Sequence, residues 1–326
     1  MSNASIVIPR PGTVNFDSNV QSIQAPPETS FVATFGQLLP PVSYFQTPNG
    51  RAAYYKLPYE APKSAGTGPI SRVLYVHGVQ TPAIGLQPLA SALSSRFPHA
   101  QCVLIDLWGH GLTDTPITPH DAALFHGLLE ALMVHLQWEN AHFVGYSFGG
   151  STTATFAAKY PERVASMVLC APAGLYRSVK FGEKELSYLR GGEGLEEEAR
   201  DWIWELLEGG KLVVPSDWKE RVDHGEVVAA AVKDWLLREH KGYLASVVGI
   251  WRDGGVLDRH AQFKEAAKKG IPNLCILGEL DGVCSVQDLS EVGMHNVTVV
   301  PQVGHPLVRE RVPEVSRLIE DFWTKL

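Results

Sequence analysis

A short glycine-rich segment, G-Y-S-F-G-G over residues 145–150, most constrains the fold of this 326-residue chain. It follows an apolar run, residues 141–144, and precedes a stretch rich in small residues, 151–159. This order predicts a strand, a sharp turn and a helix, with Ser147 at the tip of the turn. Such a turn crowds the positions two before and two after the serine, where glycine fits because it has no Cβ. The segment therefore predicts a serine hydroxyl held clear of the backbone at a helix N-terminus.

Apolar strands alternate with helices on both sides of this turn. The apolar patterns predict strands at residues 72–76, 101–105, 143–146, 164–171, 274–277 and 297–300 and helices at residues 86–97, 120–137, 148–159 and 312–323. Near-continuous apolar strands separated by helices indicate an α/β fold with a mostly parallel, twisted sheet covered on both faces. Two further runs, residues 42–47 and 51–57, flank an Asn-Gly pair, which is typical of a β-hairpin.

The alternation stops between residues 174 and 255. This stretch has a helical pattern and holds five of the eight tryptophans of the chain. It predicts a helical insertion over residues 175–255, which divides an α/β core formed by residues 41–174 and 256–326. Residues 1–40 are rich in Pro, Ser, Gln and Thr, which predicts an extended N-terminal arm.

Two loops after predicted strands supply the partners that a reactive serine needs. A serine hydroxyl is a poor nucleophile until a base takes its proton, and that base must be oriented by a third group. Asp281 follows strand 274–277, and His305 follows strand 297–300. Glu279 is an alternative acid in the same loop as Asp281. Because the carboxyl ends of parallel strands meet at one edge of a sheet, Ser147 is expected to join these residues there.

Backbone and pocket groups complete the expected site. An oxyanion that develops on a carbonyl needs N–H donors. The residue after the serine, Phe148, is expected to supply one, and Val79, in the loop after strand 72–76, the other. Candidate pocket residues come from neighbouring loops, from the elbow and from the helical insertion: Gln80, Trp108, Tyr146, Trp202 and Trp235.

Charge and apolar patterns narrow the classes of partner. The net charge is −7 and no basic patch is evident, so we expect no nucleic-acid partner. No run of 18 apolar residues occurs, so we expect no membrane span. The four cysteines lack C-x-x-C spacing, which favours buried thiols, no metal and a reducing, cytoplasmic location. The expected partner is a small-molecule substrate, with no cofactor, and the oligomeric state stays open. The terminal residues Thr324, Lys325 and Leu326 form a weak variant of a peroxisomal address.

Six segments in order give the chain a family resemblance: L-Y-V-H-G, D-L-W-G-H-G-L-T-D (106–114), G-Y-S-F-G-G, Y-P-E-R-V (160–164), G-E-L-D and G-H-P-L-V-R-E-R-V-P-E-V (304–315). In this order the chain resembles α/β-hydrolase-fold serine hydrolases with a helical cap, of the esterase, lactonase or thioesterase kind. The resemblance implies that Ser147 is the nucleophile, His305 the general base and acid, and Asp281 its orienting partner. It also implies that residues 175–255 form a cap over the pocket.

Departures from the family pattern narrow the expected reaction. The oxyanion loop reads H-G-V-Q rather than H-G-G-G, which disfavours the glycine-rich lipase subgroup. The elbow carries serine where epoxide hydrolases and haloalkane dehalogenases carry aspartate. We therefore expect hydrolysis of an ester, lactone or thioester of a medium-sized hydrophobic substrate through an acyl-enzyme on Ser147. Two alternatives stay open. One is a C–C bond hydrolase or hydroxynitrile-lyase-like enzyme that uses the same triad, and the other is a non-catalytic ligand receptor.

Overall fold

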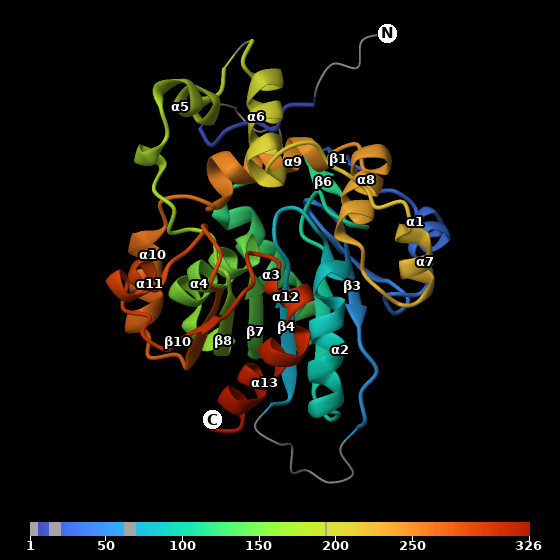
Figure 1. Ribbon diagram of the computed structural model, residues 1–326, viewed down its shortest axis with the longest axis vertical. Helices are drawn as coiled ribbons and strands as arrows, with labels where there is room; N and C mark the ends of the chain where they lie inside the picture. The colour runs from blue at the N-terminus through green and yellow to red at the C-terminus, as the bar shows by residue number, and fades with distance from the viewer. Residues whose placement is uncertain (1–5, 13–20, 62–69, 193) are drawn as a thin grey trace.

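The computed structural model describes residues 6–12, 21–61, 70–192 and 194–326, and one large sheet forms the centre of this part of the chain (Figure 1). Its eight strands lie in the order β10-β9-β8-β7-β4-β5-β3-β2. The strands are β2 (Ser43–Thr47), β3 (Gly50–Lys56), β4 (Arg72–Val76), β5 (Gln101–Ile105), β7 (Ala141–Tyr146), β8 (Val164–Cys170), β9 (Asn273–Gly278) and β10 (Val297–Val300). All neighbours from β10 to β5 pair in parallel, while β2 and β3 form the expected antiparallel hairpin. The predicted fold class, a mostly parallel sheet, is confirmed.

Helices flank the sheet in two groups. The first group is α2 (Gln87–Arg96), α12 (Leu307–Glu310) and α13 (Val312–Trp323), which pack against one another. The second is α3 (Ala122–His135), α4 (Phe148–Lys159) and α10 (His260–Lys268), in which α4 packs directly on β7 and β8. Because both faces are covered, the central strands are almost wholly buried, as their continuous apolar runs predicted.

Between β8 and α10, the described residues form a short 3₁₀ helix (Ser178–Lys180), five α-helices and a π-helical turn. The α-helices and the π-helical turn are α5 (Glu183–Arg190), α6 (Glu196–Glu208), α7 (Trp218–Asp223), α8 (Ala229–Glu239), α9 (Tyr243–Gly249) and the turn η4 (Ile250–Gly254). We call this segment, residues 183–254, the inserted helices. Figure 1 shows α5, α6 and α9 above one end of the central strands. None of the helices in the described ranges is both long and apolar enough to cross a membrane.

Two segments of the N-terminal region form regular secondary structure. Residues Glu28–Phe35 form the helix α1, and Ser22–Ile23 form β1, which pairs with β6 (Thr115–Pro116). The rings of Phe31 and Phe35 lie 5.4 and 6.0 Å from the ring of Trp235 on α8. The expectation of an extended arm over residues 1–40 is therefore wrong for residues 28–35, because an i, i+4 aromatic pair anchors a helix there. Residues 1–5 and 13–20 of the expected arm lie outside the described part of the chain.

Candidate active site

Ser147 lies at the junction of β7 and α4, in a backbone conformation that few residues other than glycine adopt. Its φ is +55°, and its side chain is almost entirely buried. A Cβ on Gly149 would lie 2.0 Å from the carbonyl oxygen of Val76, and one on Gly145 would lie 2.4 Å from the carbonyl oxygen of Gly149. Both glycines are therefore required by close backbone approach, as the pattern around the serine predicted.

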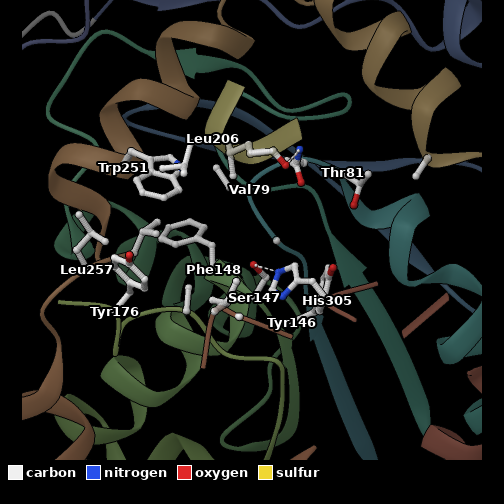
Figure 2. A pocket seen from close by; sticks show the side chains of 18 of the residues that line it. Val79, Thr81, Tyr146, Ser147, Phe148, Tyr176, Leu206, Trp251, Leu257 and His305 are labelled. Carbon is white, nitrogen blue, oxygen red and sulfur yellow. Dashed lines mark hydrogen bonds between the residues drawn. The ribbon is translucent and has the colours of Figure 1, made fainter. Parts of the chain in front are cut away.

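Two hydrogen bonds connect Ser147 to a buried carboxylate. The Oγ of Ser147 lies 2.9 Å from Nε2 of His305, and Nδ1 of His305 lies 2.9 Å from Oδ2 of Asp281 (Figure 2 shows the first contact). The Asp281 side chain is 1% exposed, and its other oxygen accepts the N–H of Val283 at 2.9 Å. This carboxylate can hold the imidazole with a proton on Nδ1, which leaves Nε2 free to accept the serine proton.

The alternative acid, Glu279, lies elsewhere. It is exposed, and its Oε2 accepts the backbone N–H of Gln302 at 2.8 Å. The structure thus brings Asp281, and not Glu279, to His305.

The loop after β4 carries Val79 beside Ser147. Val79 and Phe148 both line the same cavity as the serine (Figure 2). Phe148 is the first residue of α4, where a backbone N–H has no acceptor within the helix. Among the described residues, no hydrogen-bond acceptor is found for the N–H of Val79. Both N–H groups are therefore available to an oxygen atom placed at Ser147.

Buried polar groups hold this loop from below. His77 Nε2 accepts the N–H of Leu107 at 2.8 Å, and burial lowers the pKa of His77, so its ring is neutral. His110 Nε2 donates to the carbonyl of Val79 at 2.7 Å. Asp106 accepts from the N–H of Ala83 at 2.8 Å, and burial raises the pKa of Asp106 to about 6. These residues position the loop, and none of them lines the cavity.

The inserted helices hold the same loop from above. Gln80 Nε2 donates to Oε1 of Glu208 at 2.5 Å and to the carbonyl of Leu207 at 3.1 Å. Glu208 in turn pairs with Lys233 at 2.7 Å, and both side chains are largely buried. The carbonyl of Gln80 accepts the hydroxyl of Tyr243 at 2.8 Å. The residue next to Val79 is thus tied to α6 and to α9.

A cavity of about 310 Å³ opens at Ser147 and His305. Of the five predicted pocket residues, Gln80 and Tyr146 line it. Its apolar part comes mainly from the insertion and from the residues directly after it: Tyr176, Phe181, Leu206, Trp251, Val256 and Leu257. Figure 2 shows Tyr176, Trp251 and Leu257 together on one side of Ser147. This size suits a medium-sized small molecule.

Three predicted pocket residues lie elsewhere. Trp108 is buried beneath the loop, with 1% of its surface exposed. The ring centroid of Trp202 lies 5.3 Å from that of Phe181 and 5.7 Å from that of Tyr188. Trp235 packs against α1. The prediction for these three tryptophans is corrected, because each fills a core between elements rather than the cavity.

Sequence reasoning missed most of the residues that line this cavity, among them three with a charge or a large ring. Trp251 lies in the π-helical turn η4, a feature with no clear sequence signal. Lys233 and Arg309 are the other two. Arg309 lies only four residues after His305, so the helical turn that follows the histidine could have pointed to it.

The described residues contain no group of three or more His, Cys, Asp or Glu side chains placed to hold a metal ion. All four cysteines are free and buried, and burial raises the pKa of the Cys102 thiol to about 11.

Known proteins share this architecture. Residues 72–192 match a family model described as alpha/beta hydrolase fold. A 2-(acetamidomethylene)succinate hydrolase of Mesorhizobium japonicum is 35% identical over 106 residues, 32% of this chain and 36% of that protein. A putative 2-succinyl-6-hydroxy-2,4-cyclohexadiene-1-carboxylate synthase of Bacillus subtilis is 23% identical over 240 residues, 72% of this chain and 85% of that protein. The crystal structure of the enol-lactonase from Burkholderia xenovorans LB400 is similar with a TM-score of 0.62 and 20% identity, over 86% of this chain and 100% of that one.

Coverage limits what these likenesses carry. The alignments with two of the curated relatives span 36% and 42% of those proteins' length. Solved structures at 20% identity share a fold with this chain, so the chemistry has to be inferred from the residues of the site themselves.

Proposed function

We propose, from the premise that this chain is an α/β-hydrolase-fold protein, that it is a serine hydrolase of carboxylic esters, lactones or thioesters. The observation that carries the proposal is the pair of 2.9 Å hydrogen bonds from Ser147 through His305 to Asp281. A nucleophile, a base and an orienting acid in this geometry are the parts that acyl transfer to serine requires. The cavity beside them supports a medium-sized, largely hydrophobic substrate.

The reaction then proceeds in two halves. Oγ of Ser147 bonds to the carbonyl carbon while Nε2 of His305 takes the hydroxyl proton, and the N–H groups of Val79 and Phe148 hold the oxyanion. When the bond to the leaving group breaks, His305 gives it that proton and an acyl-enzyme remains. Water attacks the acyl carbon as His305 takes a proton from it, and Oγ regains that proton when the acid departs.

Residues 175–255 act in this proposal as a cap. They supply Tyr176, Leu206 and Trp251 to the cavity, and they hold the loop of Val79 through Gln80. Excluding water strengthens the electrostatic interactions within such a site. The α/β core, residues 41–174 and 256–326, supplies the reacting groups.

The test is Ser147→Ala under a panel of acyl esters, lactones and thioesters. We expect the rate to fall by roughly a thousandfold or more, while Ser290→Ala, an exposed serine of α11 (Val286–Glu291), leaves it unchanged. A fluorophosphonate probe should label the wild-type protein on Ser147. Hydrolysis that survives in Ser147→Ala would refute the assignment, and absence of labelling would favour a binding protein. Adding a dienone and a cyanohydrin to the panel separates C–C bond hydrolysis and cyanohydrin cleavage from ester hydrolysis.

A further inference from the structure

The charged side chains that line the cavity are positive. Its lining side chains include two cations, Lys233 and Arg309, and none of its lining residues is Asp or Glu. A cavity of this composition attracts anions, because partly buried charges are screened less than exposed ones.

The two cations differ in how far they are neutralised. Nζ of Lys233 lies 2.7 Å from Oε2 of Glu208, with the two side chains 15% and 5% exposed, so its charge is already paired. Arg309 is half-buried, and its contacts are neutral: Thr81 Oγ1 at 3.4 Å and the ring of Tyr146, whose centroid is 5.6 Å from the guanidinium carbon. Within the described residues, no carboxylate lies within 4.0 Å of the Arg309 guanidinium. Arg309 is therefore the cation of the cavity that is available to a ligand.

The position of Arg309 relates it to one side of the reacting serine. The Tyr146 and His305 rings are tilted against each other with centroids 5.2 Å apart, and the Tyr146 ring also contacts Arg309. Figure 2 shows Thr81, a partner of Arg309, beyond His305, while Trp251, Leu257 and Tyr176 lie on the opposite side of Ser147. The cavity thus has an apolar half and a cationic half, with Ser147 between them.

We infer that Arg309 binds a carboxylate on the leaving group of the substrate, while the acyl group occupies the half lined by Trp251. This inference rests on the proposed function. Because His305 must give its proton to the leaving atom, the leaving group lies on the His305 side of the scissile bond, which is the side of Arg309. A guanidinium binds a carboxylate through two parallel hydrogen bonds, which gives Arg309 both affinity and orientation to offer. The substrate class is therefore an ester formed by an apolar acyl group and by an alcohol or phenol that carries a carboxylate.

A matched pair of esters tests the inference. The probes are 4-(butanoyloxy)benzoate and its isosteric neutral amide, 4-(butanoyloxy)benzamide. We expect Arg309→Met to lower kcat/KM for the benzoate by roughly ten- to a hundredfold, mainly through KM, and to leave the benzamide nearly unchanged. Arg309→Lys should keep part of the preference. The matched control is Arg311→Met, because Arg311 bonds Glu314 at 2.8 Å and the carbonyl of Pro301 at 3.1 Å and does not line the cavity.

The contrary results are distinct. Equal losses for both esters in Arg309→Met would overturn the inference, because a merely structural role would affect them alike. A carboxylate preference found only in the acyl group, with 4-nitrophenyl hemiglutarate against 4-nitrophenyl glutaramate, would overturn the assignment to the leaving group. Labelling of Ser147 by a fluorophosphonate separates the two levels. If labelling occurs and no ester pair is discriminated, only this inference fails, whereas both proposals fall if neither labelling nor hydrolysis is seen.

Discussion

The floor and the roof of the cavity are built by different means. The floor, made of the loops after β4, β7, β9 and β10, carries Val79, Ser147, Asp281 and His305, and backbone geometry fixes these residues. The roof, made of the inserted helices, presents Leu206, Lys233 and Trp251, which reach the cavity through tertiary packing. Under the proposed function, the type of reaction is encoded locally in the floor, whereas the choice of substrate depends on how distant elements pack.

The largest expected effect lies in the floor. Asp281→Asn should reduce kcat by about ten-thousandfold, because an amide no longer holds His305 in the tautomer that accepts the serine proton. Steady-state kinetics on an activated ester measures this loss. Glu279→Gln is the control and should change kcat little, since Glu279 bonds Gln302 instead. An equal loss in both variants would show that the acid is assigned wrongly.

Backbone crowding in the floor gives the next effect. Gly149→Ala should lower the free energy of unfolding by about 4 kcal/mol or more, because the new Cβ would lie 2.0 Å from the carbonyl oxygen of Val76. Gly127→Ala, within α3, has no atom within 4 Å of its new Cβ and should raise that free energy by roughly 0.5–1 kcal/mol. Urea unfolding of both variants measures the contrast. Similar stability in the two would mean that the elbow tolerates side chains at this position.

The contact between α8 and the loop after β5 should make the stability of the protein depend on pH. His240 at the end of α8 bonds the carbonyl of Thr113 at 3.0 Å, and burial lowers the pKa of His240 to about 4. Between that value and the usual 6.5 the unfolded chain binds more protons, so stability is complete above pH 6.5 and falls as pH drops toward 4. One such histidine accounts for roughly 3 kcal/mol of this loss.

His240→Gln should flatten that pH dependence, since its amide can donate to Thr113 without titrating. Unfolding by urea at pH 7 and pH 5 measures the slope. His224→Gln, on the exposed end of α7, is the control. An unchanged slope in His240→Gln would place the acid sensitivity elsewhere, for instance at His120, which contacts Ser246 of α9 at 3.0 Å and whose pKa burial also lowers to about 4.

The smallest expected effect lies in the roof. Trp251→Ala removes a large apolar surface from the cavity and should raise KM for a hydrophobic ester by about tenfold with little change in kcat. Trp218→Ala, in α7 and outside the cavity, should leave KM unchanged. If Trp251→Ala lowers kcat by as large a factor as it raises KM, the roof contributes to the reaction itself and the contrast with the floor weakens.

The floor could be predicted from the sequence more completely than the roof. β4 and the helices α4 and α13 have the bounds that the patterns predicted, and parallel topology alone brings the loops of Ser147, Asp281 and His305 to one edge. By contrast, α1 was missed because its aromatic pair is stabilised by Trp235, more than 200 residues away in the chain. Trp251 depends on a π-helical turn, and choosing it over Trp202 or Trp235 requires knowing which face of each element meets the floor. Local patterns do not contain that information.

The hydrogen bonds from Gln80 to Leu207 and Glu208 connect the roof to the loop that carries Val79. A substrate too long for the cavity would push α6 outward, and the same displacement would pull on the loop that presents the N–H of Val79. Oversized molecules would then be bound yet turned over slowly, because the displacement of α6 that admits them also misaligns the N–H of Val79. The length of the substrate would then be limited twice, once by the volume of the cavity and once by the displacement of α6.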